Sequence, residues 1–169
     1  MTLQLRCGHI SIEPGAPIDI EIVWPTILKL ADYGEGHPQS VEDLEPHMLY
    51  GLEVRMPSIH SEFYVCREAI KLHTDITLTP QMVTFGLILA ADPDLMLTTG
   101  RGDIHVKAGD CYMLDPNKRH GTKTKGFLAF ATRDYHLESV PTADQFREQV
   151  TRELLKIAKH HHIDCRLAT

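Results

Sequence analysis

Apolar and polar residues alternate over several short stretches in the middle of the chain, with the period of a half-buried β-strand. These stretches are residues 63–66, 103–107, 111–114 and 127–132. The longer apolar run from Met82 to Ala90 predicts a buried strand. Turn residues separate the stretches, at Asp92-Pro93-Asp94, Ala108-Gly109-Asp110 and Asp115-Pro116-Asn117. Short strands at such close spacing predict a sandwich or a barrel.

Helical patterns lie toward both ends of the chain. Thr142 and Gln145 form the spacing of a capping box, and Phe146, Val150, Leu154 and Ile157 then share one helical face. We therefore expect an amphipathic helix over about residues 142–160 that packs on the outside of the barrel. In the N-terminal third, residues 18–24 alternate like a strand, and short helices are expected after Pro25 and Ser40.

Length and composition are those of one folded domain. The 169 residues, 43% hydrophobic and 24% charged, suit one core, so we expect a single domain over residues 1–169 with its barrel at about 60–135. The net charge of −6, from 17 basic and 23 acidic residues, disfavours non-specific nucleic-acid binding.

The chain also lacks the patterns of a secreted or membrane protein. It does not open on a basic start followed by an apolar stretch, and its longest apolar run, Phe85 to Ala91, is far short of the roughly 20 residues of a membrane helix. The four cysteines form no C-x-x-C pair. We expect reduced thiols, a cytoplasmic location and no membrane partner.

A candidate metal site begins at His73-Thr74-Asp75. On a strand, residues two apart point to the same side, so this H-x-D pair aims an imidazole and a carboxylate at one point. His120 follows the turn at Asp115-Pro116 and is the best candidate for a third ligand. Two histidines and one carboxylate on one face, with open positions opposite, suit non-haem iron(II).

These residues resemble the double-stranded β-helix family of Fe(II)/2-oxoglutarate-dependent oxygenases. The resemblance covers roughly residues 60–135 and consists of His73-x-Asp75, the strand VTFGLIL, the segment GDIHVKAGDCYMLDPNKRHG and a basic residue on the next strand. It implies a mainly β, jelly-roll barrel with flanking helices. It also implies that His73, Asp75 and His120 bind the catalytic Fe(II), and that 2-oxoglutarate is the cosubstrate for hydroxylation of a small molecule or peptide.

In that family a basic residue on the final strand binds the far carboxylate of 2-oxoglutarate, and we assign this role to Arg133. At period two, Arg133 shares a face with Ala129 and Ala131, which predicts a hollow with a cation at one end. Thr84, on a small-residue face of the Met82–Ala90 strand, is expected to add a hydroxyl. The family's Arg-x-Ser pair is absent, which leaves Lys123 and Lys125 as alternative anchors.

Other groups of polar residues are weaker candidates for a functional site. His60-Ser61-Glu62 is a second His-x-carboxylate pair, but no later hairpin is placed as naturally for it. Asp134-Tyr135-His136 is expected to be a loop, and His160 to His162 to end the C-terminal helix as polar groups near its dipole. The first sixty residues and the loop from Asp92 to Asp103 are expected to shape the substrate pocket.

Two other function classes stay open. One is a cupin-like metal-binding enzyme or binding module that does not use 2-oxoglutarate, because GDCYMLDPNKRHG also resembles a second cupin motif, although the first cupin motif is missing. The other is an interaction domain built on an oxygenase fold.

Overall fold

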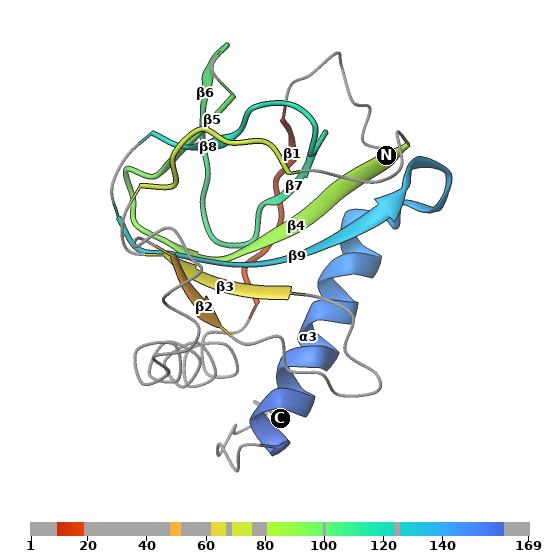
Figure 1. The fold of residues 1–169 in the computed structure, drawn as a ribbon. Helices are drawn as coiled ribbons and strands as arrows, with labels where there is room; N and C mark the ends of the chain where they lie inside the picture. Colours follow the sequence, from red (N-terminus) through yellow and green to blue (C-terminus); the bar gives the residue numbers. More distant parts are fainter. Residues whose placement is uncertain are drawn as a thin grey trace.

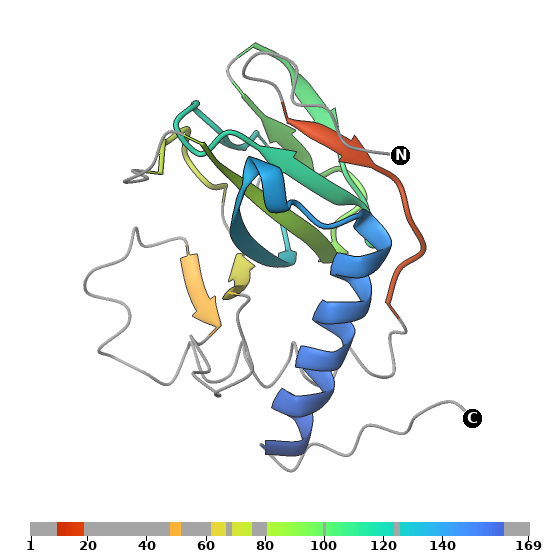
Figure 2. The same ribbon diagram turned by 90° about the vertical axis from the view of Figure 1, so that its right-hand side faces the viewer.

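The computed structural model describes residues 10–18, 48–51, 62–66, 69–75, 81–99, 101–123 and 126–160. These residues form a mainly β protein with two antiparallel sheets and one C-terminal helix (Figures 1 and 2). The predicted helices after Pro25 and Ser40, and most of the strand predicted at 18–24, lie outside the described residues.

The larger sheet has six strands and the smaller has three. The strand order of the larger sheet is β1 (Ser11–Glu13), β7 (Cys111–Leu114), β4 (Met82–Ala91), β9 (Leu128–His136), β3 (Glu62–Cys66) and β2 (Met48–Gly51). The strand order of the smaller sheet is β6 (Asp103–His105), β5 (Met96–Thr98) and β8 (Gly121–Thr122). Along the chain from β4 to β9, the strands cross repeatedly from one sheet to the other, and every pairing is antiparallel. This is a jelly-roll-like arrangement.

The predicted strands around β4, β6 and β7 are confirmed. The prediction that Asp134 to His136 form a loop is wrong, because β9 continues through all three residues and pairs them with the start of β4. The segment from Asp92 to Asp103, predicted as a loop, contains β5. A strand of three residues is too short to show a period, and the charged pair Arg133-Asp134 looked like the end of β9.

The six-stranded sheet is buried on two faces, and alternate residues of each strand serve one face or the other. Its outer face packs against α3 (Ala143–His160) through Phe63, Val83, Phe85, Leu87, Met113, Ala129, Ala131, Phe146, Val150 and Leu154. Its inner face packs against the smaller sheet and the segment before the metal site through Ile70, Ile88, Leu95, Leu97, Val106, Tyr112, Leu114 and Leu128. The inner face is therefore the one that faces the space between the sheets.

The helix α3 begins where the capping box predicts. The backbone N–H of Thr142 donates to Gln145 Oε1 at 2.9 Å, and the N–H of Gln145 donates to Thr142 Oγ1 at 3.2 Å. The ring of Phe146 then packs edge-on against Phe85, with 4.9 Å between ring centroids. The predicted helix on the outside of the sandwich is confirmed, and Figures 1 and 2 show it along the outer face of the six-stranded sheet.

In the part of the chain that the structure describes, no helix combines the length and the apolar content needed to cross a membrane. Cys111 is a free, buried thiol on the outer face of β7, and burial raises its pKa to about 11. The side chains of Cys7, Cys66 and Cys165 lie outside the described residues.

Candidate metal centre

The metal centre starts from a backbone pairing between two segments that lie far apart in the sequence. The N–H of His73 donates to the carbonyl of His120 at 3.0 Å, and the N–H of His120 donates to the carbonyl of His73 at 2.9 Å. Residues that exchange both hydrogen bonds in an antiparallel pair lie directly opposite each other, with side chains on the same face. The N–H of Asp75 donates to the carbonyl of Pro116 at 2.8 Å, which extends the contact by two residues.

This pairing points the two imidazoles into the space between the sheets. His120 and Thr122 are two residues apart in an extended segment, so they share a face. Thr122 lies opposite Leu97 of β5, whose side chain belongs to the cluster between the sheets. His120 therefore faces the same space, and His73 does so as its direct partner.

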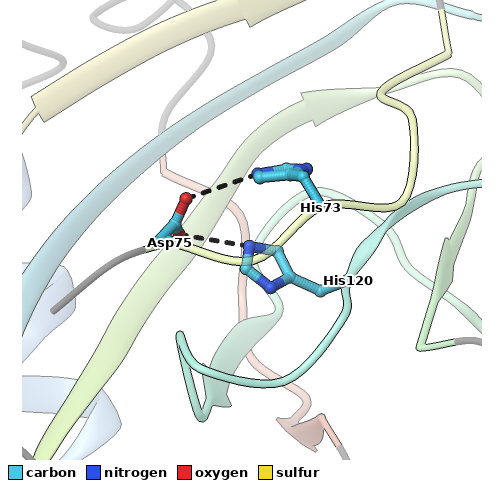
Figure 3. A group of neighbouring side chains, drawn as sticks. All are labelled: His73, Asp75 and His120. Carbon is cyan, nitrogen blue, oxygen red and sulfur yellow. Dashed lines mark ion pairs between the residues drawn. The ribbon is translucent and has the colours of Figure 1, made fainter.

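Three potential ligands meet there, and Figure 3 shows them pointing toward one another. Nε2 of His73 lies 3.4 Å from Oδ1 of Asp75, and Nε2 of His120 lies 3.2 Å from Oδ2 of the same carboxylate. The ligand atoms of all three residues lie within 4.8 Å of one another. The His120 side chain is 13% exposed, whereas those of His73 and Asp75 are 40% and 50% exposed, so the centre is open on one side.

Hydrogen bonds to the backbone fix the tautomer of both rings. Nδ1 of His73 lies 2.8 Å from the carbonyl of Lys71, and Nδ1 of His120 lies 2.8 Å from the carbonyl of Lys118. A carbonyl oxygen only accepts, so each Nδ1 carries a proton and donates it. This leaves Nε2 as the atom that can bind a metal, which is how metal-binding histidines are commonly oriented.

The donor set fits a divalent cation. Hydrogen bonding to His120, and then to His73, holds the pKa of the Asp75 carboxyl well below its usual range, so this group is ionised at neutral pH. The ionised carboxylate and the two Nε2 atoms are therefore three donors that one cation can share. Two imidazoles and one carboxylate on one side of an ion match the ligand set of non-haem iron. The structure thus brings together the three residues that the sequence predicts as metal ligands.

Thr84 and Arg133, predicted to contact one cosubstrate, point to opposite faces of the sheet. Thr84 lies opposite Asp134 and donates a hydrogen bond from Oγ1 to Asp134 Oδ1 at 2.6 Å, on the inner face. Arg133 lies opposite Phe85, on the outer face, and its guanidinium lies over the ring of Tyr135, 5.1 Å from the centroid. Sequence reasoning missed Asp134, whose inner-face position becomes visible only from the register of β4 and β9.

The hollow predicted beside Arg133 is filled. Ala129 and Ala131 are fully buried and belong to the same cluster as Phe146 of α3. The period-two count along β9 is correct, but the face was assigned wrongly. The small alanine side chains make room for the helix rather than for a ligand. The prediction that Arg133 anchors a cosubstrate beside the metal is therefore wrong.

The other candidates lie elsewhere. Lys123 forms an ion pair with Asp103, 2.5 Å away, and its side chain is 62% exposed. Lys125, His60, His161 and His162 lie outside the described residues, as does the side chain of Glu62.

The sequence matches no family model and no curated protein. The fold is similar to the crystal structure of HygX from Streptomyces hygroscopicus with nickel and 2-oxoglutarate bound. The two chains are 15% identical, the match covers 76% of this chain and 82% of HygX, and the TM-score is 0.43. The likeness is distant.

Proposed function

We propose that this protein is an Fe(II)-dependent dioxygenase that uses 2-oxoglutarate to hydroxylate an organic substrate. The observation that carries the proposal is the convergence of two Nε2 atoms and one carboxylate within 4.8 Å, with each Nδ1 held by a backbone carbonyl. We interpret the jelly-roll-like sandwich as a double-stranded β-helix.

The residues of the site have separate roles in this proposal. His73, Asp75 and His120 would hold the ion from one side, and Asp75 would offset part of its charge. Iron(II), if held there, would supply the oxidising chemistry of the reaction. The carbonyls of Lys71 and Lys118 keep both rings in the orientation that presents Nε2. The buried apolar side chains between the sheets limit the access of water to the site from the interior of the sandwich.

The use of 2-oxoglutarate rests on the sequence resemblance, and one observation favours a second candidate. The inner-face residues of β4 and β9 that the structure describes include no lysine or arginine, and Asp134 places a carboxylate there. A carboxylate repels a dicarboxylate. The second candidate is therefore a cupin-like metal enzyme that uses the same three ligands without 2-oxoglutarate.

The test separates the two candidates by uncoupled turnover. We predict that the iron-loaded protein, under air with ascorbate, forms succinate slowly from 2-oxoglutarate without a prime substrate. Asp75→Ala should abolish this activity, because a ligand to the ion is lost. Arg133→Ala should retain most of it, because Arg133 lies on the outer face. The measurement is succinate released per iron. Absence of both succinate and 2-oxoglutarate binding in iron-loaded wild type would leave the second candidate.

A further inference from the structure

One polar pair on the inner face has no part in holding the metal. Thr84 and Asp134 lie opposite each other near the start of β4 and the end of β9. Leu114 of β7 lies opposite Thr84 on its other side, and two residues later Pro116 accepts the hydrogen bond from Asp75. The Thr84–Asp134 pair thus lies at the same end of the sandwich as the metal centre and on the face that looks toward it.

The geometry of this pair leaves one carboxylate oxygen for a ligand. Thr84 is 8% exposed, and its hydroxyl donates to Asp134 Oδ1 at 2.6 Å. Asp134 itself is exposed, and the structure gives no hydrogen bond or ion pair to its Oδ2 among the described residues. A buried hydroxyl that fixes one oxygen orients the other, which reduces the entropy lost when a donor binds to it.

The surroundings of Asp134 favour a cation with an apolar body. The neighbouring positions of β4 and β9 on this face carry Gly86 and Thr132 on one side of the pair and Met82 and His136 on the other, with no lysine or arginine among the described residues there. Farther along the face, Phe130 stacks on Tyr64, with 5.1 Å between ring centroids and 23° between planes. A carboxylate followed by aromatic rings suits an ammonium group attached to an apolar part.

We propose that Asp134, oriented by Thr84, binds the ammonium group of an organic amine on which the metal centre acts. The proposal rests on the proposed function, because it places this amine beside the ion that His73, Asp75 and His120 hold. It assigns to Asp134 a role in substrate specificity and to Thr84 a positioning role.

The experiment compares two probes of one size and shape, phenethylammonium and 2-phenylethanol, by titration into zinc-loaded protein. Wild type should bind the ammonium at least about fivefold more tightly than the alcohol, a modest factor because the carboxylate is exposed. Asp134→Asn keeps an acceptor for Thr84 and should remove the preference. Thr84→Val should reduce it and leave zinc binding unchanged. The control Glu148→Gln, which removes one charge from the exposed side of α3, should retain it.

Equal binding of the two probes by wild type overturns the proposal, as does a preference that survives in Asp134→Asn. A loss of the same size in Glu148→Gln also overturns it, because net charge alone would then explain the effect. Zinc stoichiometry, measured on each protein, tests the proposed function separately. If His73→Ala binds zinc like wild type while the amine preference still follows Asp134, the proposed metal centre fails and the amine site stands.

Discussion

At the scale of single residues, both histidines of the metal centre obey one local rule. Each Nδ1 bonds to the carbonyl of the residue two positions earlier, Lys71 for His73 and Lys118 for His120. The orienting partner is backbone, so the H-x-D motif carries no side-chain pattern that reveals it. The grouping of His73, Asp75 and His120 could be predicted from the sequence, whereas the tautomer of the two rings required the structure.

Loss of one ligand should weaken metal binding severely. We predict that His120→Ala lowers the affinity for Fe(II) or Ni(II) at least about a hundredfold, because two remaining donors cannot hold an open-sided ion tightly. Calorimetric titration measures the affinity. His105→Ala is the matched control, since His105 is exposed on β6 and contacts the carbonyl of Pro93. A His120→Ala protein that binds metal like wild type contradicts the assignment.

A substitution at Gly86 tests how tightly the inner face of the larger sheet is packed against Tyr112. A Cβ at this position would lie 2.0 Å from Cζ of the Tyr112 ring. Gly86→Ala must push this buried ring aside, and we expect a loss of about 1–3 kcal/mol in the free energy of unfolding. Gly102→Ala is the control, because no atom lies within 4 Å of its added Cβ. Chemical denaturation measures the free energy of unfolding of both variants. Equal losses in the two variants would show that the Tyr112 ring can move aside at no cost in stability.

At the scale of elements, the period of a strand predicts which residues share a face but not which face they share. In β4 the seven residues from Val83 to Leu89 are all buried, so the sequence offers no polar side to mark the outside. The same holds for the first half of β9, where Ala129 faces the helix and Leu128 faces the smaller sheet. This is why Arg133 was assigned to the wrong face. The helix α3 was predictable because its cap and its apolar stripe are both local.

The capping box of α3 should contribute measurably to stability. Thr142→Ala removes the hydroxyl that accepts the N–H of Gln145, and we expect a loss of about 1 kcal/mol in the free energy of unfolding. Thr142→Ser keeps the acceptor and should recover most of this loss. Urea denaturation followed by circular dichroism measures both. If Thr142→Ser is as unstable as Thr142→Ala, the hydroxyl is not the cause.

At the scale of the whole molecule, the metal centre depends on pairings that no local pattern encodes. His73 and His120 are separated by 47 positions in the sequence, and they meet because residues 69–75 pair with the segment that leads into β8. The short strands β5 and β8 that support this layer have three and two residues and show no period of their own. The period of two on a strand grouped His73 with Asp75, and the place of His120 after a turn, together with the resemblance to a known family, suggested the third member of the group.

The central claim is that His73, Asp75 and His120 hold one iron(II) ion that also binds a 2-oxo acid. Anaerobic titration of the protein with Fe(II) and 2-oxoglutarate, followed through the weak visible charge-transfer band of the complex, tests it most directly. We predict that the band appears in wild type, saturates at one iron per chain and is absent in Asp75→Ala. A wild-type protein that binds no iron, or a band of equal strength in Asp75→Ala, would contradict the account.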